Sequence, residues 1–529
     1  MNTKAVARIV TPDHPVRTNE TDWIFPSYPI VIGKDVLELL SSAMYLDPMT
    51  IYREYIQNAA DAIDQARTAG EIKRGNIQVY IDAEARSVRI RDNGAGLPWK
   101  VFVERLTNIG ASPKRGTPAR GFRGVGRLAG LGYCQSLIFR SRASGEEDIS
   151  EMRWDCRQLK SSLRAVDVTT DLAGVIRSVV TVRRIKQKST SERFFEVELQ
   201  GIIRHRNDRL LNAQAVEDYL SQVAPVPFHP DFRFANEISA TLRAHVSLGD
   251  VHIHVNGSQD PIYRPFRNFI ETDTDKRQRV RELEVKTLKG SEGDIAAVLW
   301  LLHHDYTGAI PNRALIKGIR FRVGNIQVGE ASLLEELFPE PRFNSWSIGE
   351  VHVIDQRLVA NGRRDHFEHG IHLDNLFNQL APVARDITRR CRQSSLARKW
   401  ARDFELHRDA AFEKAKIVSR GGLSRAAKRA HAESAEKSLH AMRKAAAHQQ
   451  LPEEIRQRLA SEAEAAEMRI TKLLGSYANA TDPLDRFRPE TRSAFRRVID
   501  LIYQCASNRS AAAVLVEKIL TKLAEEQPK

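Results

Sequence analysis

Apolar residues recur with helical spacing near the start of the chain and with alternating spacing soon afterwards. Residues 34–67 carry the helical pattern, with a break at Asp47–Pro48, and two alternating runs follow, NIQVYIDA and SVRIRD, with EARS between them. A period near 3.6 predicts an amphipathic helix, and a period of two predicts a half-buried strand. This stretch therefore predicts helices packed on an antiparallel hairpin.

More strand-like runs follow, and they suggest two mixed domains. QSLIFRSR, GVIRSVVTVRRI and RFFEVEL come first, then LRAHVSL, VHIHVNG, IAAVLWLLHHDY, IKGIRFRVGNIQVG and SIGEVHVID. We expect an α+β sandwich over residues 30–187, with a mostly antiparallel sheet, and a second α+β domain over residues 188–385. Residues 1–29, which contain four prolines, predict an irregular N-terminal arm.

The pattern from residue 386 to residue 529 is almost entirely helical. Apolar side chains recur every fourth residue at Leu396, Trp400 and Phe404, and Gly421–Gly422 ends that run. Further helices are expected at residues 452–475, 488–504 and 509–525. Such apolar stripes are typical of a helical bundle or a coiled coil.

Composition places the chain among ordinary globular proteins. It has 529 residues, 42% of them hydrophobic and 28% charged, with no apolar run long enough for a transmembrane helix and no secretory signal at its start. The four cysteines are scattered and form no C-x-x-C pair. This usage predicts a reducing, cytoplasmic environment without disulfides or structural zinc. The lack of a long apolar run predicts no membrane partner.

Positive charge is concentrated in the C-terminal third. The formal net charge is +14, and about +10 of it lies beyond residue 385. A basic region favours a nucleic acid or another anionic partner. The alternative is a solvated helical surface that happens to be rich in arginine and lysine.

The helix predicted around YREYIQNAADAI carries a polar edge. Glu54 and Asn58 lie one turn apart on the same face, with Asp61 three residues further on. A carboxylate can act as a general base, and an amide oxygen suits Mg²⁺, which prefers oxygen ligands together with phosphates and water. The alternative for each residue taken alone is a solvated polar position.

Two glycine-rich turns accompany that helix. Asp92 ends a predicted strand next to Gly94 and Gly96, where it is suited either to accept a hydrogen bond from an exocyclic amine or to cap a turn. Gly124 and Gly126, ahead of a predicted helix, suit phosphate oxygens. The spacing G-x-G-x-x-A also fits a dinucleotide site, but that reading is disfavoured because a loop rather than a strand precedes the motif. The sequence contains no P-loop motif.

Taken in order, three stretches resemble the motifs of the GHKL ATPase superfamily. They are Glu54-x-x-x-Asn58-Ala59-Ala60-Asp61-Ala62, Arg91-Asp92-Asn93-Gly94-Ala95-Gly96-Leu97 and Gly121-Phe122-Arg123-Gly124-Val125-Gly126. The superfamily contains Hsp90-type chaperones, MutL-type repair proteins, type II topoisomerase ATPase subunits, MORC proteins and histidine kinases. The resemblance implies the Bergerat fold, in which helices cover an antiparallel sheet, with ATP and Mg²⁺ as cofactors.

The resemblance also implies roles for individual residues. Glu54 matches the general base, Asn58 the Mg²⁺ ligand, and Asp61 the aspartate that supports the nucleotide through water. Asp92 matches the residue that binds adenine. The residues expected around the base are Gly94, Gly96 and Leu97, and those expected in the phosphate loop are Gly121, Gly124, Val125 and Gly126. Residues 98–120 are expected to form a lid over ATP, in which Lys114 contacts a phosphate.

Within the superfamily, the chain most resembles Hsp90. The similarity is carried by YLDPMTIYREYIQNAADAIDQAR, by LTNIGAS at residues 106–112, and by IDQRLVANGRRD at residues 354–365. The last stretch is similar to the middle-domain loop whose arginine reaches the γ-phosphate, which gives that role to Arg364, with Arg363 as the second choice and an exposed basic turn as the alternative. The C-terminal third matches no Hsp90 motif.

These observations predict a Mg²⁺-dependent ATPase that closes as a homodimeric clamp. Its cargo is expected to be a protein client, in a chaperone-like or bacterial defence or stress role, or a nucleic acid held by the basic C-terminal third, as in MutL and MORC proteins. One alternative is a switch that binds ATP without hydrolysing it. A histidine kinase is disfavoured because only His14, in the proline-rich arm, precedes Glu54.

Overall fold

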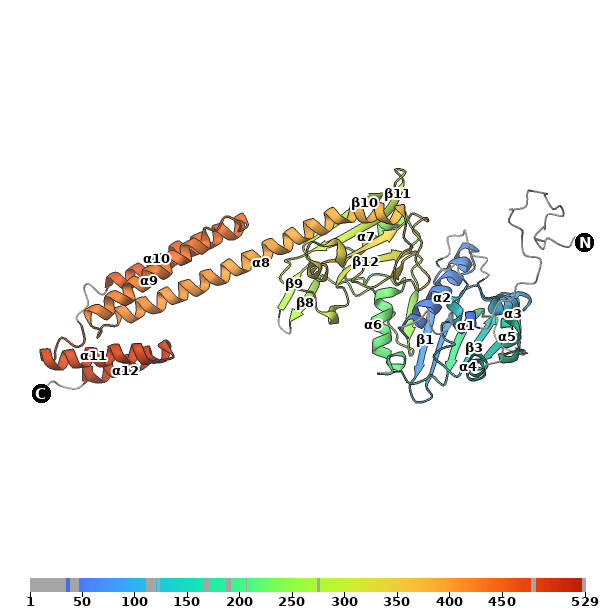
Figure 1. Ribbon diagram of the computed structural model, residues 1–529, viewed down its shortest axis with the longest axis horizontal. Coiled ribbons are helices and arrows are strands. Elements are labelled where there is room, and N and C mark those ends of the chain that lie inside the picture. Colours follow the sequence, from blue (N-terminus) through green and yellow to red (C-terminus); the bar gives the residue numbers. More distant parts are fainter. Residues whose placement is uncertain are drawn as a thin grey trace, which may run out of the picture.

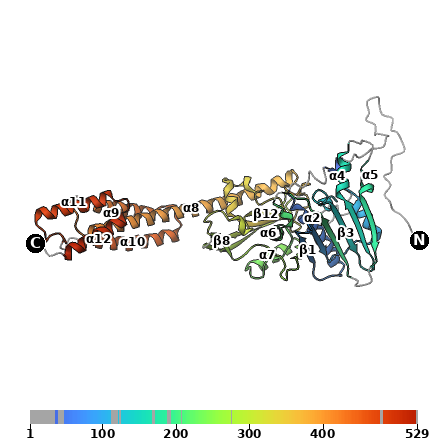
Figure 2. The same ribbon diagram turned by 90° about the horizontal axis from the view of Figure 1, so that it is seen from below.

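The computed structural model arranges the chain as three parts in a row, with two sheet-containing domains followed by a helical arm (Figures 1 and 2). It describes residues 35–38, 47–110, 120, 124–165, 171–186, 192–205, 207–273, 276–476 and 482–525. The predicted N-terminal arm lies outside these residues. The mixed α+β class predicted from the sequence is confirmed.

Among the described residues, the first sheet has seven strands in the order β5-β4-β3-β6-β2-β1-β7. They are β1 (Asn76–Asp82), β2 (Ser87–Asp92), β3 (Ser136–Arg142), β4 (Ile149–Asp155), β5 (Val180–Ile185), β6 (Phe194–Gln200) and β7 (His252–Val255). All neighbours are antiparallel except β1 and β7, which are parallel. The predicted hairpin is present, with Ile77 opposite Asp92 and Val79 opposite Ile90.

One face of this sheet is apolar and carries the helices. These are α1 (Asp35–Glu38), α2 (Thr50–Thr68), α3 (Trp99–Thr107), α4 (Cys156–Arg164), α5 (Leu172–Val179) and α6 (Ala213–Val223). Alternate strand residues such as Val79 and Ile90 enter the same core as Ile56 of α2. The other face carries charged side chains, among them Arg140, which pairs with Glu151 at 2.7 Å. The alternating strand pattern thus separates core from solvent.

Two features of the first domain differ from the sequence prediction. The run GVIRSVV was expected to be a strand, but it forms most of α5, because the Asp171 side chain caps that helix by accepting a hydrogen bond from the Gly174 amide at 2.7 Å. In addition, β6 and β7 join the first sheet although both lie beyond the predicted boundary at residue 187. The first sheet therefore draws on chain that the sequence assigned to the second domain.

The second domain is built on five strands in the order β10-β11-β14-β12-β13. They are β10 (Glu282–Lys289), β11 (Ile295–His303), β12 (Gly318–Val323), β13 (Ile326–Val328) and β14 (Ile348–Val353), with a separate ribbon of β8 (Phe269–Asp273) and β9 (Lys276–Arg279). The interior strand β11 is apolar on both faces: Leu299 packs towards α8 (Ile371–Ser419), and Trp300 packs towards α7 (Ala235–Arg243). Burial on both sides explains the unbroken apolar run IAAVLWLL.

A buried cluster of charges ties the second sheet to the segment that leads into it. Glu350 of β14 is fully buried and pairs with Arg264 at 2.6 Å and with Arg322 at 2.5 Å. Arg322 also donates to the carbonyl oxygen of Gln222, near the end of α6. The two arginines hold the pKa of the Glu350 carboxyl well below its usual range despite the burial, which by itself raises that pKa.

The C-terminal part is helical, as predicted. After α8 come α9 (Arg425–Ala446), α10 (Glu453–Ser476), α11 (Pro489–Cys505) and α12 (Arg509–Glu525). Helix α8 starts before the predicted boundary at residue 386, because its first turns belong to the core of the second domain. Gly421 and Gly422 end it with positive φ angles. Within the described residues, no helix is long and apolar enough to cross a membrane.

Candidate functional site

Helix α2 forms the back wall of the site predicted from the sequence. It lies between the first sheet and the second domain, so its side chains are buried nearly all the way round (Figure 1). Glu54 and Asp61 are buried, and Asn58 between them is half-buried. The polar edge predicted for this helix therefore does not face open solvent.

Asp92, at the end of β2, forms the second wall. Its carboxylate is buried and accepts a hydrogen bond from the Gly94 amide at 2.8 Å. Burial raises the pKa of Asp92 to about 7, although the bond from Gly94 and the charge of Arg91 act in the opposite direction. Because a buried carboxyl with one donor still has acceptor capacity, it suits a further polar hydrogen such as an exocyclic amine.

The turn after Asp92 is pressed between α2 and β3. A Cβ atom at Gly94 would lie 2.7 Å from the carbonyl carbon of Ala62, and one at Gly96 would overlap the carbonyl oxygen of Arg142. Gly96 also has a φ of +67°, which favours glycine. Leu97 is fixed by its amide, which donates to Ser141 Oγ at 2.6 Å. Glycine is thus required here for close backbone packing.

The second glycine turn lies against Glu54. Gly124 has a φ of +70°, and a methyl group at Gly126 would overlap Oε2 of Glu54. Val125, between the two glycines, is buried. The structure therefore brings Gly124, Val125 and Gly126 beside α2, 70 residues on from the predicted base.

The helix expected after this turn is only a three-residue 3₁₀ turn, Gly126–Leu128. Two further glycines, Gly130 and Gly132, follow within six residues and disfavour a longer helix. The amide of Gly130 instead donates to the Tyr55 hydroxyl of α2 at 3.0 Å. Lys114 and Gly121, also predicted for this region, lie outside the described residues.

The second domain reaches the same place through the loop that follows β14. Nε of Arg364 lies 3.8 Å from Oε1 of Glu54, and its Nη2 donates to the carbonyl oxygen of Arg120 at 2.6 Å. Arg363 takes part differently: its carbonyl oxygen accepts a hydrogen bond from Arg53 at 3.0 Å. Of the two arginines considered from the sequence, Arg364 is thus the one whose side chain meets Glu54.

Two further arginines in the site were missed by the sequence analysis. Nη2 of Arg53 lies 3.5 Å from Oε1 of Glu54, which places a second guanidinium beside this carboxylate. Arg120 pairs with Asp61 at 3.3 Å and donates to the carbonyl oxygen of Gly324, in the second domain, at 2.6 Å. The only sequence signals for these two residues are that Arg53 precedes Glu54 and that Arg120 precedes the glycine turn. Neither signal reveals that the side chain makes a contact with the second domain.

The side chains gathered here suit a nucleotide and a magnesium ion. Asp92 has acceptor capacity for a base, and arginine and backbone amides are natural partners of phosphates. Within the described residues no three His, Cys, Asp or Glu side chains cluster as a metal site. Mg²⁺ does not require one, since it is commonly held by one or two protein oxygens and the substrate phosphates, and Asn58 offers such an oxygen.

Comparison with known proteins agrees with this geometry. Residues 49–184 match the family described as Histidine kinase-, DNA gyrase B-, and HSP90-like ATPase. The chaperone protein HtpG of Baumannia cicadellinicola subsp. Homalodisca coagulata is 28% identical over 145 residues, 23% of this chain and 22% of that protein. HtpG of Dechloromonas aromatica (strain RCB) is 27% identical over 168 residues, 26% of each chain.

The matched region therefore spans only about a quarter of the length of these relatives. The family match, residues 49–184, covers α2, both glycine turns and Asp92, and it ends before the loop that carries Arg364. Residues 49–184 of this chain form a GHKL ATPase domain, with a distant and partial similarity to HtpG chaperones of the Hsp90 type.

Proposed function

We propose that this protein is a Mg²⁺-dependent ATPase whose active site is completed by its second domain. GHKL domains typically bind ATP with Mg²⁺ and hydrolyse it. The observation that carries the proposal is the meeting of Arg364 and Glu54, because it joins a cation of the second domain to a buried carboxylate of the first. Two domains that share one site can couple hydrolysis to their relative position.

Each residue then has a chemical task. Asp92 accepts the adenine amine, with Gly94, Gly96 and Leu97 shaping the base pocket, and Asp61 supports the nucleotide through water. Asn58 holds Mg²⁺, which when bound neutralises phosphate charge. The phosphates lie along Gly121, Gly124, Val125 and Gly126, with Lys114 as a further contact.

Glu54 and Arg364 serve the reaction itself. Glu54 orients a water molecule and accepts its proton as the water attacks the γ-phosphorus, the bond from that phosphorus to the β–γ bridging oxygen breaks, and ADP and inorganic phosphate leave. Arg364 stabilises the charge that develops on the transferred phosphoryl group. Because Glu54 is buried and the Arg364 side chain is only 12% exposed, their electrostatic interaction is stronger than it would be in water.

We further propose that ATP closes two copies of the chain into a dimeric clamp. The relatives are named chaperone proteins, but the similarity covers only about a quarter of their length. A role of the clamp in the cytoplasm, either chaperone-like or in defence or stress, is therefore part of this proposal. Mass measured by light scattering should double with a non-hydrolysable ATP analogue. A monomer under saturating analogue would exclude the dimeric clamp and leave the ATPase untouched.

The decisive experiment measures ATP binding and steady-state hydrolysis separately, on wild type and on Glu54→Ala, with Mg²⁺ and with excess chelator. We expect Mg²⁺-dependent hydrolysis that falls about 10²–10⁴-fold in the variant, since a positioned general base contributes that much, while affinity for ATP is nearly unchanged. Binding without hydrolysis in the wild type would identify an ATP-dependent switch instead. Loss of binding in Glu54→Ala would show that Glu54 is structural.

A further inference from the structure

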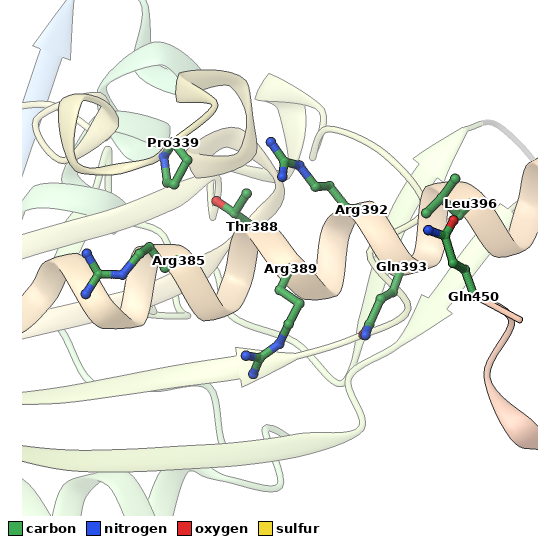
Figure 3. Close-up of a pocket in the computed structure, with 8 residues that line it drawn as sticks. All are labelled: Pro339, Arg385, Thr388, Arg389, Arg392, Gln393, Leu396 and Gln450. Atoms are coloured by element: carbon green, nitrogen blue, oxygen red, sulfur yellow. The ribbon is translucent and has the colours of Figure 1, made fainter.

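A cavity far from the nucleotide site is lined mainly by arginine and glutamine. It has a volume of about 450 Å³ and lies between α8, the loop at Pro339 and the turn between α9 and α10. Its lining residues are Pro339, Arg385, Thr388, Arg389, Arg392, Gln393, Leu396 and Gln450, and we call this cavity the arginine groove (Figure 3).

Positive charge in the arginine groove exceeds what its neighbours neutralise. Arg389 pairs with Asp386, and Arg392 pairs with Glu340 at 2.6 Å, yet each of the two arginine side chains stays more than half exposed. Asp386 and Glu340 are also shared with Arg390 and Arg342. Arg385 is exposed, and its side chain makes no hydrogen bond or ion pair with any residue that the structure describes.

The floor of the groove contains an unused polar atom. Thr388 is 3% exposed, and within the described part of the chain its Oγ1 has no hydrogen-bond partner. A buried hydroxyl without a partner is costly, so it suits a site where a ligand supplies an acceptor. Thr388 lies between Arg385 and Arg392 in Figure 3.

We propose that the arginine groove binds the phosphate backbone of a nucleic acid. Figure 3 shows that the three guanidinium groups spread away from one another along α8 and do not converge on one point. Residues 385, 389 and 392 also extend over about 10 Å of the helix axis, at about 1.5 Å per residue. This arrangement suits a chain of anions better than one compact anion, and arginine pairs with phosphate in a bidentate manner.

The lining also indicates how the strand is recognised. None of the eight lining residues is aromatic, so the groove offers no platform on which bases could stack. Contacts would go to phosphates, assisted by the amides of Gln393 and Gln450, and they would carry little sequence information. The net charge of about +10 beyond residue 385 adds long-range attraction for the same ligand.

This inference goes beyond the proposed ATPase and does not depend on it, because binding is measured without nucleotide. The probes are a fluorescently labelled DNA duplex of about two helical turns and a single strand of the same length. Their affinities for the full-length protein are followed by anisotropy across a salt series. The test variant is R385Q/R389Q/R392Q. The matched control, R429Q/R458Q/R497Q, removes the same charge from exposed arginines on α9, α10 and α11.

We expect the groove variant to bind at least about tenfold more weakly, and its salt dependence to fall by about two to three in log–log slope, since each lost phosphate contact contributes about 0.9. The control should stay within about threefold of wild type. Equal losses in both variants, no loss in the groove variant, or no binding by wild type would overturn the proposal. So would equally tight, equally arginine-dependent binding of polyglutamate.

An unchanged melting temperature shows that each triple variant is folded. If the groove triple fails that check, Arg385→Glu replaces it, because Arg385 is exposed and its substitution breaks no described ion pair. This single charge reversal should lower the affinity for both DNA probes by at least about threefold. An unchanged affinity would reject the groove.

Discussion

Nε of Arg364 lies 3.8 Å from Oε1 of Glu54, although the two residues are 310 positions apart in the chain. One belongs to the loop after β14 and the other to α2, so the contact joins the two sheet-containing domains. Arg53, next to Glu54, strengthens the junction through the carbonyl oxygen of Arg363. Hydrolysis in this protein should therefore respond to changes in either domain.

The two adjacent arginines of that loop should differ sharply in importance. Arg364→Ala should lower kcat about 10³-fold or more, as removal of an arginine that stabilises phosphoryl transfer does. Arg363→Ala should change kcat by only a few-fold, because its contact with Arg53 uses the backbone carbonyl, which alanine retains. Steady-state hydrolysis on both variants gives the comparison, and a larger loss at Arg363 would reverse the assignment.

Gly126 should be intolerant of a single methyl group. Gly126→Ala would push the Glu54 carboxylate away from its position, since the new Cβ overlaps Oε2. We expect kcat to fall about 10²-fold, because a misplacement near 1 Å has that effect, with a smaller change in KM. Gly308→Ala is the matched control, as a Cβ there meets nothing within 4 Å. Comparable losses in both variants would show that the effect is not local.

ATP affinity should depend on the ionisation of Asp92. Its pKa of about 7 means that the neutral carboxyl accumulates as pH falls from 8 to 6. If adenine requires the carboxylate, affinity falls by up to about tenfold for each pH unit below 7. Asp92→Asn should bind ATP weakly and lose this part of the pH dependence, which equilibrium titration at several pH values would reveal. Normal ATP affinity in Asp92→Asn would remove Asp92 from the adenine pocket.

Ionisation of Asp92, which should favour ATP binding, should lower the stability of the folded protein. Because folding raises the pKa of Asp92 from 3.8 to about 7, its contribution is fully present below about pH 4 and is lost as pH rises through 7. Without ATP, Asp92→Asn should therefore melt several degrees above wild type at pH 8 and show little difference near pH 4. About 1 kcal/mol shifts the Tm of a domain this size by about 2–4 °C. A lower Tm at pH 8 would contradict this account.

Neutralising the buried carboxylate of the second domain should be strongly destabilising. Glu350→Gln would leave Arg264 and Arg322 buried without their anion, at a cost of about 3–5 kcal/mol. Glu271→Gln removes the partner of Arg277 from a pair in which both side chains are more than half exposed, and it should cost less than about 1 kcal/mol. Denaturant unfolding of both variants measures the difference, and similar values would refute the role given to the cluster.

The elements that could be predicted are those whose pattern is local. The period of α2 placed Glu54 and Asn58 on one face, and alternation gave the β1–β2 hairpin that ends at Asp92. The run GVIRSVV misled because a single capping aspartate outweighed its strand-like composition. Short-range propensity is a weak guide wherever one such hydrogen bond can decide between two structures.

What escaped prediction depends on contacts between distant segments. Nothing local indicates that β7 pairs with β1, so the sequence pattern did not predict that β7 joins the first sheet. Arg120 was missed for the same reason: its side chain connects Asp61 to Gly324, 204 residues away from it. Sequence patterns pointed to the residues that are proposed to carry the chemistry, while the residues that join the domains required the structure.

Helix α8 has a mechanical consequence that follows from its length. It runs through 49 residues, about 70 Å at 1.5 Å per residue, so a tilt of about 5° at its base would move its far end by about 6 Å. Its first turns are embedded in the second domain, and its last turns in the helical arm. Any small rearrangement that tilts α8 beside the second sheet would therefore be amplified, in proportion to the length of the helix, at the tip of the molecule.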